Sequence, residues 1–134
     1  MIGLCYDGIP IAGVIKRTDE GSLSDTYVSY DNTCLKLSKL QTGAYDVEQV
    51  ELSHCEEVVI PMSTDCPDTE QQELIKAIDP DEVKIVSGAG AKFCHLLDGS
   101  LTLIAWGRAM DSWDICAGVA LVTAAGATVT DMNG

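Results

Sequence analysis

Basic residues are scarce in this chain, and their scarcity excludes two classes of partner. The 134 residues include 8 Lys and Arg against 21 Asp and Glu, which gives a formal net charge of −13. The summed negative field repels phosphate backbones and anionic lipid surfaces. The sequence therefore predicts that the chain binds neither nucleic acid nor membranes. A small phosphorylated molecule remains compatible with this charge if divalent cations reverse it locally.

Long apolar runs and closely spaced cysteines are also missing. No stretch approaches the roughly 20 apolar residues that span a bilayer, and the first residues lack the features of a secretory signal. The cysteines form no C-x-x-C pair, which argues against a zinc site or a disulfide scaffold. We therefore expect a cytoplasmic location and reduced, mostly buried thiols at Cys5, Cys34, Cys55, Cys66, Cys94 and Cys116.

The apolar content is sufficient for one ordinary domain, which we expect to cover residues 1–134. Hydrophobic residues make up 46% of the chain, enough for a substantial core. In the first half, apolar segments 1–5 and 9–15 flank Asp7-Gly8, a pattern typical of a tight β-hairpin. A short strand at 27–30 and a half-buried strand from Cys34 should follow, separated by polar, exposed segments.

The second half alternates between strand and helix patterns. Buried strands are predicted at 57–61 and 83–86, flanking a helix over 69–78 that Asp68 or Thr69 caps, with Gln71 or Gln72 reaching back. Asp79-Pro80 should end this helix. The remaining predictions are a helix over 91–97 closed by Gly99, a strand at 101–106, a helix from Ser112 to Gly126 and a strand at 128–131. This alternation predicts an α/β fold in which a mixed β-sheet packs with helices.

A glycine-rich turn before the helix over 91–97 is the first candidate site. Gly88 and Gly90 would let backbone amides approach a ligand, and a helix amino terminus favours an anion. The turn is neither a Walker loop nor a dinucleotide fingerprint, because Phe93 stands where those motifs need Ser or Thr and a third glycine. An ordinary strand-to-helix turn is the alternative, and Lys92 taken alone could equally be a solvated lysine.

Asp114 is the second candidate, because it falls in the first turn of the last predicted helix. The helix dipole keeps a carboxylate ionised there, and an ionised carboxylate is a good ligand for a hard cation. The alternative is that Asp114 simply starts the helix. Magnesium needs more than one carboxylate, and Asp111 is the only close acidic neighbour in sequence.

Other residues invite more ordinary interpretations. Small residues from Ala117 to Ala125 should let the last helix pack closely on a sheet. Trp106 and Trp113 are expected to be packing residues. The pairs His54-Cys55 and Cys94-His95 could suggest a Cys-His hydrolase, but this is the weaker alternative. Adjacent side chains on one element point in different directions, and no third residue that would orient the histidine is evident.

Two segments together resemble the carboxyl-terminal signature of the inositol monophosphatase superfamily. They are SGAGAKFCHLLDGSLTLIAW and SWDICAGVALVTAAGATVTDMNG, and their W-D-x-x-A and A-G-G-x-x-x-D-like motifs place five residues in register: Trp113, Asp114, Ala117, Gly126 and Asp131. IGLCYDGIPIAGVI and IDPDEVKIVSGAGAK resemble the branch that hydrolyses 3′-phosphoadenosine 5′-phosphate. The inositol polyphosphate phosphatases are the nearest competitor.

The resemblance implies a fold, an activity and roles for particular residues. The fold would be the carboxyl-terminal half of a layered αβαβα sugar-phosphatase sandwich, and the activity that of a Mg²⁺-dependent, lithium-sensitive phosphomonoesterase. Asp114 would bind the metal, Gly88, Ala89 and Gly90 would touch the substrate through backbone groups, and Lys92 would meet the nucleotide or its phosphate. Only Asp114 matches the family's metal ligands, and the motifs that carry the others, an E-E pair and a D-P-x-D-G-T run, would be expected before Met1. We therefore expect the isolated chain to have little or no activity.

Three alternatives stay open. Nucleotidases of the family carry an Arg-Ser-His-like run where this chain has Thr64-Asp65-Cys66-Pro67, so an inositol phosphate remains a possible substrate. The chain could instead be a ligand-binding module without catalysis. It could also be a homo-oligomer or a partner-dependent domain, because its first hairpin would otherwise leave a free sheet edge.

Overall fold

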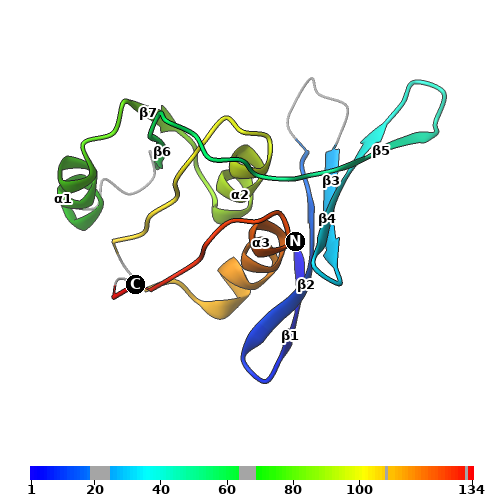
Figure 1. Cartoon of the computed structure of the whole chain (residues 1–134), viewed down its shortest axis with the longest axis horizontal. Helices are drawn as coiled ribbons and strands as arrows, with labels where there is room; N and C mark the ends of the chain where they lie inside the picture. Colours follow the sequence, from blue (N-terminus) through cyan, green and yellow to red (C-terminus); the bar gives the residue numbers. More distant parts are fainter. Residues whose placement is uncertain (19–24, 64–68, 108, 132) are drawn as a thin grey trace.

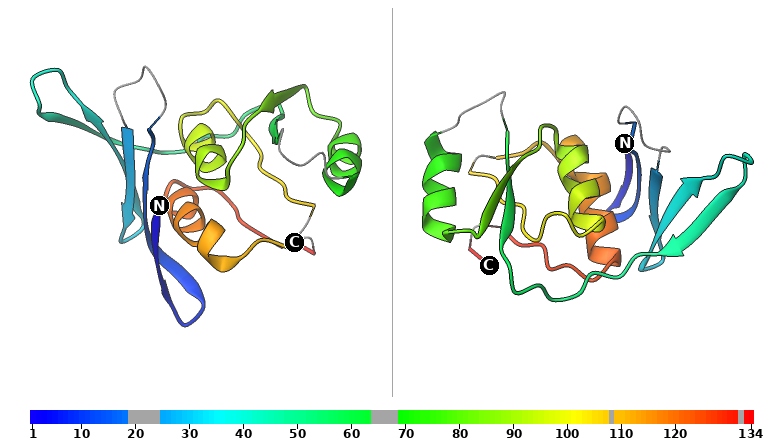
Figure 2. Two further views of the ribbon diagram at one scale, coloured as in Figure 1. Left: turned by 180° about the vertical axis from the view of Figure 1, so that it is seen from behind. Right: turned by 90° about the horizontal axis from the view of Figure 1, so that it is seen from above.

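The computed structural model describes residues 1–18, 25–63, 69–107, 109–131 and 133–134. An antiparallel sheet lies at one side of the molecule, helices α2 (Ala89–Leu97) and α3 (Ser112–Ala124) pack beside it, and a small parallel sheet and helix α1 (Thr69–Ile78) follow (Figures 1 and 2). This alternation of sheets and helices agrees with the predicted layered α/β fold. Cys66 and the surrounding residues 64–68 lie outside the described residues.

The antiparallel sheet is a simple meander of five strands in chain order. It consists of β1 (Ile2–Tyr6), β2 (Ile9–Lys16), β3 (Asp25–Tyr30), β4 (Thr33–Lys39) and β5 (Tyr45–Gln49). The predicted first hairpin is confirmed, and Asp7 and Gly8 turn it with φ of 49° and 78°. Positive φ at both central residues matches the right-handed twist of the flanking strands. β5 was not predicted, because it lies in the acidic stretch after Leu40, where apolar side chains are few.

Close backbone contacts hold α3 against the first hairpin. Gly3 and Gly13 are cross-strand partners. A Cβ at Gly13 would lie 2.3 Å from the carbonyl oxygen of Ala117, and one at Gly3 would lie 2.7 Å from its amide nitrogen. Any larger residue at either strand position would push the helix away, which confirms the predicted close packing of this helix on a sheet.

Helices α2 and α3 meet at an equally tight point. A Cβ on Gly118 would lie 2.0 Å from the Phe93 ring. The Trp106 ring packs against the same Phe93 ring, with the two ring centroids 5.6 Å apart. The buried core fills the space between the sheet and the two helices, and it is formed by Ile15, Tyr27, Cys34, Phe93, Cys94, Leu97, Ala117, Leu121, Val122 and Ala125.

A strand–helix–strand unit forms the other side of the molecule. β6 (Val59–Met62) and β7 (Glu82–Ile85) pair in parallel, and α1 connects them. β6 is buried as predicted, but the prediction of a buried β7 is wrong, since Ile85 is 58% exposed. Gln71 does not complete a capping box, because its side-chain amide donates to the Pro61 carbonyl at 3.3 Å. The helix ends before Asp79-Pro80, as predicted.

Two predicted strands are wrong. Residues 101–106 form no strand, although the Thr102 amide donates to the Val59 carbonyl at 3.0 Å. The Val59 amide donates in return to the Thr102 hydroxyl at 2.8 Å, and not to a backbone carbonyl, so no ladder forms. Residues 128–131 pair with no strand among the described residues. An apolar pattern favours a strand, but a strand needs a backbone partner to form a ladder.

The exposure of several single residues also differs from expectation. Trp113 was predicted to pack, yet it is 72% exposed, whereas Trp106 packs as predicted. Mostly buried thiols were expected, but of the five described cysteines only Cys34 and Cys94 are buried. Periodicity cannot tell which face of an element another part of the chain covers. Among the described residues, the helices are too short or too polar to cross a membrane.

We predict that Gly118→Ala lowers the free energy of unfolding by about 1–3 kcal/mol, because the new methyl group overlaps the Phe93 ring. Urea denaturation measures the loss. The matched test is the same change in a Phe93→Leu background, where a smaller side chain should make the added methyl group less costly. An equal loss in both backgrounds would contradict this contact as the cause.

We also predict an alkaline loss of stability that depends on Cys34. Burial raises the pKa of its thiol from 9.0 to about 11. Between these values the unfolded chain binds fewer protons than the folded chain, so stability falls as pH rises. Cys34→Ala should reduce the fall between pH 9 and 11 by about 1–2 kcal/mol. Urea denaturation across this pH range measures it, and exposed Cys55→Ala should leave the slope unchanged.

Candidate functional site

The predicted glycine-rich turn is the amino terminus of α2. Gly88 is the residue before the helix, with φ 84° and ψ 134°, and the helix begins at Ala89, two residues earlier than predicted. The Lys92 amide donates to the Gly88 carbonyl at 3.2 Å and so starts the helical hydrogen bonding. The amides of residues 89–91 precede it and belong to the first turn, where helix geometry supplies no acceptor. Such amides favour an anion.

The two glycines of this turn serve different purposes. Gly88 has a backbone conformation that L residues rarely adopt, although a Cβ there would meet nothing within 4 Å. Gly90 has ordinary helical geometry, and a Cβ there would meet Met1 Sδ at 3.7 Å and Ile15 Cγ2 at 3.9 Å, which are normal contacts. Only Gly88 is therefore required by the local backbone.

Lys92 is not a solvated lysine. Its residue is only 3% exposed, and its ammonium group donates to Ser63 Oγ at 2.9 Å. Lysines are almost never buried without a polar partner. Sequence reasoning missed Ser63, because 29 residues separate it from Lys92 and no local pattern links them. The contact joins the first turns of α2 to the end of β6.

Asp114 lies in the first turn of α3, as predicted, and is half-buried. Its backbone amide donates to the Asp111 carbonyl at 2.9 Å. One turn later, Ala117 contacts Gly3 of β1 and Gly13 of β2, while Gly90 of α2 faces Ile15 of β2 and Met1, which precedes β1. Two residues along a strand span about 7 Å. The structure therefore places the start of α2 and the first half of α3 against one end of the hairpin.

The described residues do not form a complete magnesium site. Among them, no group of three or more His, Cys, Asp or Glu side chains is placed to hold a metal ion. Magnesium in proteins is usually held by one or two carboxylates together with water and substrate phosphates. Asp114 fits one position of such a site, and further ligands would have to come from elsewhere.

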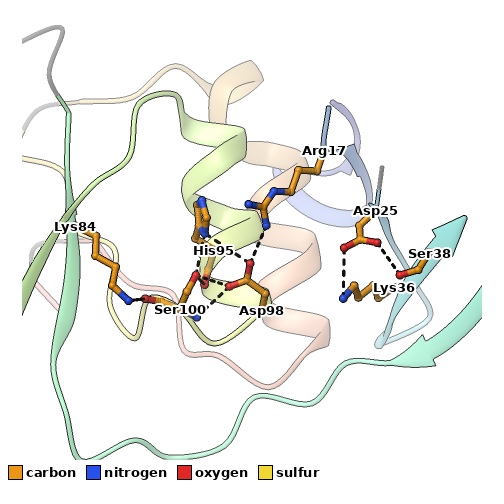
Figure 3. Close-up of polar contacts among 8 residues, drawn as sticks. All are labelled: Arg17, Asp25, Lys36, Ser38, Lys84, His95, Asp98 and Ser100. Atoms are coloured by element: carbon orange, nitrogen blue, oxygen red, sulfur yellow. Dashed lines mark hydrogen bonds and ion pairs between the residues drawn. The ribbon is translucent and has the colours of Figure 1, made fainter. Parts of the chain in front are cut away.

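A polar cluster closes the other end of α2 (Figure 3). Arg17 donates to Asp98 at 2.9 Å, which ties the end of β2 to the helix. The Ser100 hydroxyl approaches the same carboxylate closely, and His95 Nδ1 lies 2.8 Å from that hydroxyl. Asp98 also lies 3.6 Å from Nδ1. In a Ser-His-Asp triad the serine and the aspartate contact opposite ring nitrogens of the histidine. Here Ser100 and Asp98 both contact Nδ1, so the cluster is not such a triad.

Two other features lie apart from the predicted site residues. The adjacent Cys94 and His95 separate as expected, since Cys94 is 1% exposed in the core and His95 faces the polar cluster. A groove of about 410 Å³ lies between the strands of the first hairpin, the turn that joins β3 to β4, and the end of α3. Its lining includes Leu4, Ile11 and Thr123, and none of the predicted site residues.

Comparison with known proteins identifies the family to which this α/β chain belongs. Residues 1–134 match the inositol monophosphatase family, and the chain belongs to that family. Among curated proteins, it is similar to 3′(2′),5′-bisphosphate nucleotidase 1 of Mus musculus and of Homo sapiens, at 26% identity over 144 aligned positions in each case. The match covers 100% of this chain and 43% of each relative, so the chain spans less than half their length.

We predict opposite effects of alanine at the two glycines of the turn. Gly88→Ala should lower the free energy of unfolding by about 1–3 kcal/mol, because alanine is strained at this φ and ψ. Gly90→Ala should raise it by up to about 1 kcal/mol, because alanine favours a helix and its methyl group has room. Urea denaturation measures both changes. Equal effects at the two positions would contradict the assigned conformations.

Proposed function

We propose that this chain is part of a Mg²⁺-dependent, lithium-sensitive phosphomonoesterase that acts on 3′-phosphoadenosine 5′-phosphate or a related small phosphate. The first turn of α2 carries the proposal, since helix geometry supplies its amides with no acceptor and such amides favour an anion, in a member of this family. The names of the similar nucleotidases support the choice of a nucleotide bisphosphate as substrate.

Each proposed role follows from where the residue lies at the start of α2 or of α3. Gly88, Ala89 and Gly90 bring backbone groups to the phosphate. Lys92 adds positive charge beside these amides, and Ser63 holds its ammonium group in place. Asp114 contributes one carboxylate to Mg²⁺ from a helix start that is braced against the hairpin. The bound ion would supply charge neutralisation for the phosphate and would lower the pKa of a bound water.

The chain alone is proposed to bind the phosphate without turning it over, because Asp114 is one ligand of a site that needs several. The predicted homo-oligomer stays a prediction. It is supported by the exposed apolar side chains of β1, where Ile2 is 75% and Tyr6 74% exposed. Sedimentation of the purified chain would give its mass in solution.

We predict that Ala89→Asp abolishes binding of 3′-phosphoadenosine 5′-phosphate while the fold is preserved. A carboxylate in the first turn stabilises the helix by about 0.3–1 kcal/mol but repels a phosphate from the same amides. Isothermal titration calorimetry measures binding, and urea denaturation measures stability. Ala89→Asn controls for size, and Thr42→Asp in an exposed turn controls for net charge.

The assay has clear alternative outcomes. Unchanged binding by Ala89→Asp would contradict the α2 site. Tighter binding of an inositol phosphate than of the nucleotide would keep the site and change the substrate. Phosphate release in Mg²⁺ that lithium inhibits and Asp114→Asn abolishes would contradict the prediction of inactivity, because the remaining ligands would then come from this chain or its oligomer.

A further inference from the structure

Two cysteines that are 111 positions apart in the sequence meet where α3 crosses β1. A Cβ on Gly3 would lie 2.7 Å from Cys116 Sγ, so this thiol sits directly over the strand. Cys5 follows Gly3 by two residues, and the extra residue at the register shift after Leu4 lies on β2, where Ile11 has no partner in β1. β1 therefore keeps its alternation, and Cys5 points to the same face of the sheet as Gly3. Cys116 Sγ therefore lies over the position next to Cys5 on this face of β1. Burial raises the pKa of the Cys116 thiol, and the Cys5 thiol raises it further.

We propose that Cys5 and Cys116 form a reversible disulfide that links β1 to α3. Both cysteines lie on regular elements that the Gly3–Ala117 contact holds together. Disulfide geometry requires Cβ atoms roughly 4 Å apart, and neighbouring thiols on two packed elements can meet it with small side-chain rotations. The proposal concerns the thiol pair alone and does not depend on the phosphatase function.

The other described cysteines are unsuited to this role. Cys34 and Cys94 are buried in the core. Cys55 is exposed in the segment before β6, and its thiol donates to the Ser53 carbonyl at 3.7 Å. Cys5 is exposed, whereas Cys116 is half-buried. Cys5 is therefore the thiol that an external oxidant reaches first, and Cys116 is its resolving partner.

A low-molecular-weight disulfide such as oxidised glutathione is a sufficient oxidant. The Cys5 sulfur attacks one glutathione sulfur, and one glutathione leaves as a thiol. The Cys116 sulfur then attacks the Cys5 sulfur in the mixed disulfide, and the second glutathione leaves as a thiol. Two protein thiols are oxidised, one glutathione disulfide is reduced, and the two protein hydrogens end on the two glutathione thiols.

The bond would stabilise the protein because it closes most of the chain into a loop. In the chain-entropy account, a longer closed loop restricts the unfolded state more strongly. We expect the melting temperature of the oxidised protein to rise by about 5–10 °C. Dithiothreitol should reverse the rise, because it reduces the bond.

The test is incubation of the purified chain with oxidised glutathione, followed by intact mass measurement and peptide mapping without reductant. We expect a monomer that has lost two hydrogen masses and contains a Cys5–Cys116 peptide. Cys55→Ser should retain the bond, whereas Cys5→Ser should lose both the bond and the gain in melting temperature. Cys116→Ser should retain one glutathione on Cys5.

Three results would overturn the proposal. The first is a stable glutathione adduct on Cys5 of the unsubstituted protein that never resolves. The second is a disulfide that maps to another pair of cysteines. The third is a rise in melting temperature that persists in Cys5→Ser. If Cys116→Ser does not fold, Cys5→Ser still decides the question, because Cys5 is exposed.

Discussion

The contact between α3 and the first hairpin is the constraint on which the rest of this structure depends. Gly3, Gly13 and Gly118 provide no side chain where the helix meets the strands and the Phe93 ring, so backbone and ring atoms occupy that space. Close approach removes water from both surfaces and brings many atoms into van der Waals contact. Few other residues could replace these glycines without moving the helix.

This packing also positions the candidate site. α2 rests on α3 through Phe93 and Gly118, and its first turn faces Met1 and Ile15 on the hairpin. The Arg17–Asp98 ion pair holds the opposite end of α2 to β2. The proposed phosphate-binding amides and Asp114 are therefore attached to one rigid unit rather than to separate loops. Such support is what an anion site made of backbone groups needs.

Local sequence patterns were sufficient for some parts of the structure. The Asp7-Gly8 turn, the helix over 69–78, the last helix and its end near Gly126 were predicted correctly, because turn residues and helical periodicity act over a few neighbours. The resemblance also predicted the family, which the match over residues 1–134 confirms. The roles of Gly88, Ala89, Gly90, Lys92 and Asp114 stay predictions.

Features that depend on distant parts of the chain could not be predicted in this way. The burial of Lys92 depends on Ser63, and the failure of residues 101–106 to form a strand depends on how Val59 and Thr102 meet. The exposure of Trp113 and Ile85 depends on which surfaces other elements cover. Each case turns on a contact between segments whose separation in sequence carries no periodic signal.

The most direct test of the proposed site is a ¹H–¹⁵N NMR titration of the chain with 3′-phosphoadenosine 5′-phosphate, with adenosine as the reference ligand. The largest shifts specific to the phosphates should fall on the amides of Ala89, Gly90 and Ala91. Shifts concentrated instead around the groove lined by Leu4 and Ile11, or no phosphate-specific shifts at all, would contradict the account.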